Sequence, residues 1–170
     1  PANWSIFQHA RGIISHSECV RRMAKQWYGE NVPENWEIIP LLRVPSSSSD
    51  YAEGRKILRI APNDFVLCSF GMLGPTKLNH RLVESWCRSR LARDGHCRLV
   101  FVGECPAGEY SDRLTKIIRE KKCDNITITG WVDLHRFKEW LAVADAAVQL
   151  RTNSRGETSA AVLDCMNYGI

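Results

Sequence analysis

The stretch Phe65-Val-Leu-Cys-Ser-Phe-Gly-Met-Leu-Gly-Pro-Thr-Lys77 decides how this chain folds. Six mostly apolar residues predict a short buried strand, and the two glycines after them predict a tight loop before a helix. The same order of strand, loop and helix then recurs along the chain. Strands are expected at 65–70, 98–102, 126–129 and 146–150, and helices at 79–89, 110–121, 134–143 and from 158 onward. Such alternation predicts an α/β fold with a doubly wound parallel sheet and helices on both of its faces.

Residues 1–44 predict a smaller unit that precedes this sheet. A strand at 12–14, a helix from Ser15-His-Ser-Glu18 to Gly29 and a strand at 36–39 form one β-α-β unit, too small to bury a core alone. The serine hydroxyls are expected to cap the helix. The polar stretch 45–50 is expected to be a linker, with Asp50 capping a helix over 51–60. Residues 51–170 form the second domain, and both ends of the chain resemble cut ends of a larger fold.

Composition excludes several classes of protein. A hydrophobic fraction of 44% and a charged fraction of 25% are ordinary for a globular chain, and a net charge of +4 gives no argument for nucleic acid. There is no apolar run of about 18 residues, so no membrane span is expected. The seven cysteines form no C-x-x-C pair, which argues against a disulfide framework and against a zinc site. Reduced cysteines favour the cytoplasm.

The loop after the fourth predicted strand is the best candidate for an anion site. A helix that starts near Thr158 leaves backbone N–H groups free at the positive end of its dipole, where a phosphate binds well. Arginine forks suit phosphate geometry. The residues expected to contribute are Arg151, Arg155, Thr158 and Ser159.

Two carboxylates accompany this loop. Asp164 follows Glu157 by seven residues, about two helical turns. Phosphates held by amides, with a carboxylate deeper in the site for sugar hydroxyls, suggest a nucleotide-sugar site. The alternative places Asp164 on a solvated face of its helix.

The loops after the other strands offer further candidates, because ligands of open parallel sheets lie beyond the carboxyl ends of the strands. After the first strand, Lys77 supplies a positive charge, although the spacing excludes a Walker A loop and a solvated lysine remains the alternative. After the third strand, Trp131 is either the wall of a base pocket or ordinary packing. The other candidates in these loops are Gly71, Gly74, Thr76 and Val132, while Glu104 and Cys105 are expected to belong to a plain turn. The five histidines show no metal spacing, and His80 and His135 are expected to be exposed.

Residues 65–169 resemble the C-terminal, donor-binding domain of GT-B glycosyltransferases, most of all the retaining family 4. The family's loop Gly-Arg-Leu-x-x-x-Lys-Gly is similar to Gly71-Met-Leu-Gly-Pro-Thr-Lys-Leu78, with Met72 in place of the arginine. By this resemblance, Lys77 contacts the donor diphosphate. Residues 130–132 are similar to the Gly-x-Val/Ile segment beside the nucleobase.

The family's second signature is Glu, seven intervening residues, Glu, and then Ala-Met-Ala-x-Gly. Its second half is similar to Leu163-Asp-Cys-Met-Asn-Tyr-Gly169, which makes Asp164 the acid that binds the ribose hydroxyls. Strict spacing places the first acid at Gly156, whereas the chain has Glu157. The early strand and helix resemble the end of the family's N-terminal, acceptor-side domain, so the resemblance covers nearly the whole chain.

The resemblance implies a retaining transfer of a sugar from a nucleotide diphosphate sugar to the hydroxyl of a glycan or lipid-linked acceptor. Lys77 and Glu157 are the implied catalytic residues, and neither a metal nor a cofactor is needed. The expected location is cytoplasmic or peripheral at the inner membrane face. Two alternatives stay open: a GT-B sugar-nucleotide epimerase, with Glu157 and Glu104 as acid and base, and a non-catalytic binding module of a polysaccharide-assembly protein.

Overall fold

The computed structural model describes residues 4–46, 51–152, 154 and 156–170. The chain divides into two compact units. The first contains the described residues up to Val44 together with those that follow Thr152 as far as Ala160, and the second contains the remainder. Asp50, the expected helix cap, lies outside the described residues.

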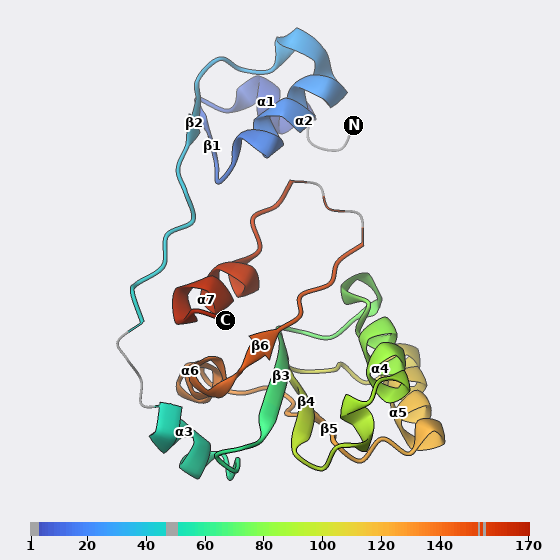
Figure 1. Ribbon diagram of the computed structural model, residues 1–170. Helices are drawn as coiled ribbons and strands as arrows, with labels where there is room; N and C mark the ends of the chain where they lie inside the picture. Colours follow the sequence, from blue (N-terminus) through green and yellow to red (C-terminus); the bar gives the residue numbers. More distant parts are fainter. Residues whose placement is uncertain (1–3, 47–50, 153, 155) are drawn as a thin grey trace. The chain divides into compact units, whose positions relative to one another are not determined.

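A four-stranded parallel sheet forms the centre of the second unit (Figure 1). Its order is β5-β4-β3-β6, and every neighbouring pair is parallel. The strands are β3 (Phe65–Phe70), β4 (Cys97–Val102), β5 (Ile126–Ile128) and β6 (Ala146–Ala147). The chain passes through a helix between each strand and the next, so all four strands run in the same direction and their carboxyl ends lie at one edge. The predicted parallel sheet is confirmed.

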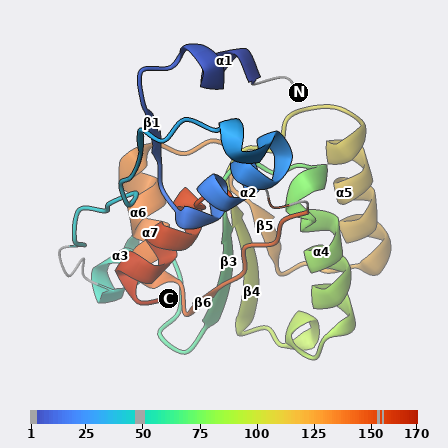
Figure 2. The ribbon, with the colours of Figure 1, turned by 90° about the horizontal axis from the view of Figure 1, so that it is seen from above.

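Helices cover both faces of this sheet, as Figures 1 and 2 show. On one face lie α4 (Asn79–Arg88) and α5 (Glu109–Lys121), which pack against Leu99 and Phe101. On the other lie α6 (Leu134–Val143) and α7 (Ala160–Tyr168), which pack against Val100 and Val102, and α3 (Tyr51–Ile57) packs beside α6. These four neighbours in β4 point alternately to the two faces, and all are 1% exposed or less. The fold is therefore doubly wound, as predicted.

Strand β6 is shorter than the predicted 146–150. The Val148 N–H still donates to the carbonyl oxygen of Cys68 at 2.9 Å, but the ladder stops there. The side-chain amide of Gln149 takes over, with its oxygen 2.7 Å from the Phe70 nitrogen and its nitrogen 3.2 Å from the Phe70 oxygen in the orientation that satisfies both groups. A side chain thus replaces the main chain as the partner of the last β3 residue.

Helix α3 ends at Ile57, three residues before the predicted 60, and Leu58 and Ile60 just beyond its end pack into the core. Ile57 is 46% exposed, whereas Gly54 and Arg55 are buried. The Arg55 guanidinium lies 2.7 Å from Oδ2 of Asp145, and that oxygen also accepts the Val66 N–H at 2.7 Å. Arg55 further donates to three carbonyl oxygens, those of Ala61, Pro62 and Asp64. The ion pair between buried Arg55 and the partly exposed Asp145 therefore anchors α3 to the start of β3.

The first unit is built on β1 (Ile13–Ser15), α2 (Glu18–Tyr28) and β2 (Trp36–Ile38), with the two strands parallel. A further helix that the sequence analysis missed, α1 (Trp4–His9), supplies Phe7, whose ring lies 4.9 Å from Tyr28 and 5.8 Å from Trp36 between centroids. Ala24, Val32 and Trp36 are the buried residues of this core. The added helix compensates for the small size of the β-α-β unit.

The expected hydroxyl caps of α2 are wrong. Ser17 occupies the N-cap position, but its side chain makes no capping bond and instead donates to the carbonyl oxygen of Gly156 at 3.2 Å. Ser15 accepts the indole N–H of Trp36 at 2.8 Å. These hydroxyls serve tertiary contacts. The contact at Gly156 also explains why residues after Thr152 join the first unit, although the sequence places them in the second domain.

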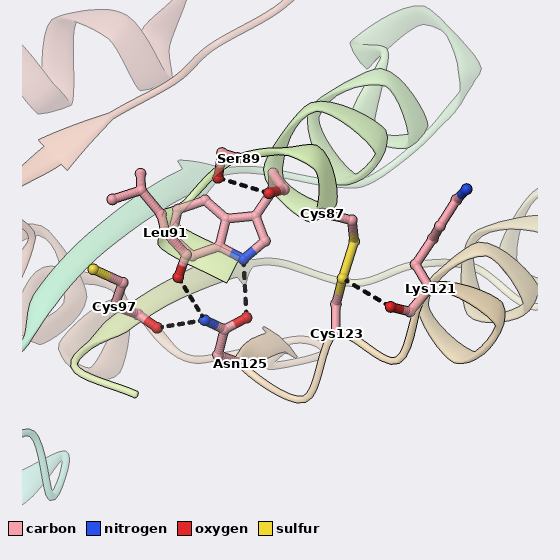
Figure 3. The surroundings of a disulfide bond; sticks show 8 residues. Cys87, Ser89, Leu91, Cys97, Lys121, Cys123 and Asn125 are labelled. Atoms are coloured by element: carbon pink, nitrogen blue, oxygen red, sulfur yellow. Dashed lines mark hydrogen bonds between the residues drawn. A yellow bond between two sulfur atoms is a disulfide. The ribbon is translucent and has the colours of Figure 1, made fainter. Parts of the chain in front are cut away.

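The structure contains one disulfide, although the cysteine pattern argued against a disulfide framework. Cys87 of α4 is bonded to Cys123, just beyond α5, across a sequence separation of 36 (Figure 3). Beside this bond, Asn125 donates to the carbonyl oxygens of Leu91 and Cys97. The unpaired cysteines are Cys19, Cys68, Cys97, Cys105 and Cys165, and burial raises the pKa of the Cys68, Cys97 and Cys165 thiols. In the part of the chain that the structure describes, no helix has the length and apolar character needed to cross a bilayer.

Candidate functional site

The loops after β3 and β4 are joined at the carboxyl edge of the sheet. The Gly71 N–H donates to the Val102 oxygen at 3.0 Å, and the Leu73 N–H donates to the Glu104 oxygen at 2.8 Å. Gly103 lies so close to Gly71 that a Cβ atom on Gly103 would overlap the Gly71 carbonyl. Gly103 is needed here because the two main chains touch without space for a side chain, whereas Gly71 is favoured by its φ of +102°.

The neighbouring loops extend this edge on both sides. Towards β5, the Gly103 N–H donates to the Thr129 hydroxyl at 3.1 Å. Towards β6, the Thr152 N–H donates to the Thr76 oxygen at 2.9 Å, which places the segment after β6 beside the loop of Lys77. Gly71, Gly74, Thr76 and Lys77 therefore belong to a continuous row of loops, as expected for a ligand-binding edge.

Lys77 ends the short 3-10 helix η2 (Pro75–Lys77) and is half-buried. Its N–H donates to the Gly74 oxygen at 3.0 Å, so the loop turns tightly just before the side chain. Leu78 follows in the left-handed region, with φ +52°, and occupies the N-cap position of α4 without a capping side chain. A left-handed leucine is unusual and is tolerated only where surrounding contacts hold it.

Such contacts come from residues that the sequence analysis did not single out. Asn79, 4% exposed, accepts the Gly74 N–H through Oδ1 at 3.0 Å. The Tyr110 hydroxyl from α5 lies 3.2 Å from both the main-chain nitrogen and Nδ1 of His80. The local signal for Asn79 was its type, since Asn side chains bond to nearby main chain in turns. Nothing local could have indicated Tyr110.

His80 was expected to be exposed, but the structure differs. It is half-buried, and its ring meets the Tyr110 ring edge-on with centroids 5.8 Å apart. Burial, and then the nearby Arg113 charge, lower the pKa of His80, while burial raises the pKa of Tyr110. His135 is exposed, as predicted, with 86% of its side chain accessible.

A cavity of about 280 Å³ opens next to this cluster. The Lys77 loop contributes Leu73, Gly74 and Pro75, and the residues 106–110 at the start of α5 form the other side. Tyr110 therefore contacts both the cavity and the base of α4.

Trp131 follows β5 and is 76% exposed, so it is not ordinary packing. Val132 is half-buried and packs against the core on the α6 side. Asp133 caps α6 by accepting the Arg136 N–H at 2.8 Å. The capped helix holds the loop, while the indole remains available at the carboxyl edge of the sheet.

The predicted phosphate loop belongs to the first unit from the residues after Thr152 onward. Helix α7 begins at Ala160, so Thr158 and Ser159 precede the helix, which was expected from Thr158. Both are half-buried, and Glu157 is exposed. Arg155 lies outside the described residues. These positions cluster with the first unit, whereas Lys77 and Trp131 belong to the second.

Asp164 lies on α7 in the second unit and is half-buried, between the two alternatives that the sequence left open. Burial of Tyr168, and then the negative charge of Asp164, raise the pKa of Tyr168. Arg151 is exposed beyond β6. Within the described ranges, no three His, Cys, Asp or Glu side chains come together in a way that could hold a metal ion.

A parallel sheet with helices on both faces and tight glycine loops at its carboxyl edge defines the Rossmann-like class of α/β domains. Residues 50–170 match the family model described as glycosyl transferases group 1, so the chain belongs to this family. No curated protein matches the chain in sequence.

Solved structures with the same fold are GT-B glycosyltransferases. Anabaena HepE in complex with UDP and glucose has 22% identity and a TM-score of 0.77, over 96% of this chain and 44% of its own. Sucrose-phosphate synthase from Thermosynechococcus elongatus has 17% identity and a TM-score of 0.75, over 97% and 40%. WaaG, a glycosyltransferase involved in lipopolysaccharide biosynthesis, has 14% identity and a TM-score of 0.73, over 93% and 42%. The chain thus has the fold of part of a GT-B glycosyltransferase and spans less than half the length of these proteins.

Proposed function

We propose that the chain is the donor-binding part of a retaining GT-B glycosyltransferase, which transfers a sugar from a nucleotide diphosphate sugar to an acceptor hydroxyl on a glycan or lipid-linked molecule. The observation that carries the proposal is the Lys77 loop. It places a half-buried cation at the carboxyl edge of the sheet of a family member. HepE, with the same fold, was crystallised with UDP and with UDP-glucose.

In this proposal, the charge of Lys77 stabilises the diphosphate as it leaves the sugar. A cation held in place before the reaction stabilises developing negative charge without having to reorganise. The amides of Thr158 and Ser159, with Arg155, contribute to the same anion, and no metal ion is required. Glu157 is assigned to the sugar hydroxyls, because a carboxylate beside a diphosphate is repulsive.

The other site residues are assigned to the nucleoside. Exposed Trp131 offers its indole face to the base, with Val132 beside it. Asp164 on α7 is assigned to the ribose hydroxyls. The first unit is assigned to the end of the acceptor-side domain. Five unpaired cysteines fit a cytoplasmic location, and the Cys87–Cys123 pair is the observation against it.

One observation favours a second candidate, a non-catalytic binding module. Met72 stands where the family motif has an arginine and is 63% exposed, so this site has one cation fewer beside the diphosphate. A module of this kind would bind nucleotide sugars without turning them over.

The test uses the full-length protein with UDP-, GDP- and ADP-sugars, with and without acceptor. Transfer to an acceptor supports the transferase, conversion of the sugar without acceptor indicates an epimerase, and binding without turnover indicates the module. We expect Lys77→Ala to lower kcat by about 10²–10³, the range for removing one preorganised oxyanion contact. Lys77→Arg should recover part of the loss. The matched control is Lys56→Ala, since Lys56 is exposed on α3. Wild-type turnover in Lys77→Ala would refute the diphosphate assignment.

A further inference from the structure

Asn79 closes the loop that carries Lys77. It is the first residue of α4, and its Oδ1 reaches back to accept the Gly74 N–H. Within the ring so formed, the Lys77 N–H donates to the Gly74 oxygen and the Leu78 N–H donates to the Pro75 oxygen. Because Asn79 is 4% exposed, water cannot readily replace its side chain as the acceptor.

Tyr110 caps α4 from another helix. The His80 N–H is among the first main-chain donors of α4, which have no partner within the helix. The N-cap residue Leu78 supplies no side-chain acceptor, and the Tyr110 hydroxyl of α5 takes its place at 3.2 Å. The same hydroxyl lies 3.5 Å from Oδ1 of Asn79. One tyrosine thus contacts both residues that follow the left-handed Leu78.

We propose that Asn79 and Tyr110 are positioning residues, which hold the Lys77 loop in the conformation that contacts the donor diphosphate. This inference rests on the proposed function. Neither residue needs to touch the diphosphate: Asn79 acts through the Gly74 N–H, and Tyr110 acts through the start of α4. The left-handed conformation of Leu78 is one that an unrestrained loop would leave, so the loop depends on these two contacts.

The experiment is a double-mutant cycle on the full-length protein, with calorimetric binding of the nucleoside diphosphate that the wild type prefers. Tyr110→Phe removes only the hydroxyl, and Asn79→Leu removes the acceptor with little change in size. Each should weaken binding about fivefold, the factor for one lost hydrogen bond. In the Lys77→Ala background, neither should weaken it further, because both act through Lys77.

Two further measurements separate positioning from general destabilisation. Hydrogen exchange of the Gly74 to Leu78 amides should accelerate in both variants without ligand. Tyr51→Phe is the matched control, since it removes a hydroxyl bond to Asp145 at the opposite edge of the sheet and should leave binding unchanged. Equal losses of affinity with and without the Lys77→Ala substitution, or no loss in the protein that keeps Lys77, would overturn the inference. A wild type that binds no nucleoside diphosphate would overturn the proposed function, and the inference with it. If Asn79→Leu does not fold, Tyr110→Phe alone decides.

Discussion

At the residue scale, the buried charges of the second unit are all tied to partners at the amino ends of the strands. Asp64, 5% exposed, accepts from Arg98 at 2.8 Å, from His96 at 3.2 Å and from the Ala61 N–H at 3.3 Å. Burial alone would raise the pKa of Asp64, but these hydrogen bonds and the Arg98 charge outweigh it and lower that pKa. The ionised carboxylate therefore stabilises the fold.

Replacing Asp64 with Asn should lower the free energy of unfolding at pH 7 by about 1–3 kcal/mol, the cost of leaving charged hydrogen-bond partners unsatisfied. A pKa that is lower in the folded state stabilises fully above the unfolded value, near 4, and this stabilisation is lost as the pH falls through the folded value. The difference between wild type and Asp64→Asn should therefore shrink below about pH 4.

Denaturant unfolding followed by circular dichroism between pH 3 and pH 7 measures this difference. The exposed Asp124→Asn variant serves as the control and should match the wild type throughout. A penalty for Asp64→Asn that does not change with pH would show that the charge of Asp64 is irrelevant to stability.

At the element scale, the contact between α3 and α6 depends on a glycine inside a helix. Gly54 is buried, and a Cβ atom there would lie 2.7 Å from Cγ1 of Val143. Glycine in a helix costs about 0.5–1 kcal/mol relative to alanine, so its presence here requires a compensating gain. That gain is the close approach of the two helices, which also lets Arg55 reach Asp145.

Gly54→Val should destabilise the second unit by about 1–3 kcal/mol, because extra atoms in a packed contact force the helices apart. Ala52→Val, on the exposed side of the same helix, controls for the lower helix propensity of valine and should cost less than about 1 kcal/mol. Thermal unfolding of both variants gives the comparison. Equal melting temperatures of the two variants would mean that α3 can shift without loss of stability.

At the scale of the whole molecule, the chain passes three times between its two units, after Val44, after Thr152 and after Ala160. The segment between the last two of these crossings contacts α2 through Gly156, which has φ +81°. A Cβ atom on this glycine would lie 3.1 Å from Met23 and 3.2 Å from Cys19. The candidate phosphate residues that follow are thus held by the first unit.

Gly156→Ala should loosen this attachment, because a left-handed alanine costs roughly 1–2 kcal/mol and its methyl group crowds α2. Hydrogen exchange should increase at residues 157–159 and at the start of α2, while β3 to β5 keep their protection. Gly95→Ala is the control, since no atom lies within 4 Å of a Cβ atom there. Unchanged exchange at 157–159 would show that another contact holds the segment.

The parallel sheet could be predicted from the amino-acid sequence alone. The apolar runs, the glycine loops and the helical periods are local patterns, and right-handed parallel crossovers leave little choice of topology once they are set. The place of Lys77 and Trp131 at the carboxyl edge of the sheet could be predicted in the same way, because the carboxyl ends of parallel strands must meet at one edge.

The side chains that meet across this framework depend on three-dimensional packing. Three contacts join residues far apart in the sequence. The separation is 90 residues for Arg55 and Asp145, 31 for Tyr110 and Asn79, and 36 for Cys87 and Cys123. The same is true of Gly156, which lies beside α2 through packing that no pattern around it indicates. Such contacts depend on how strands and helices are arranged in space. Hydrophobic periodicity shows which face of an element is apolar, but not which polar side chains become neighbours.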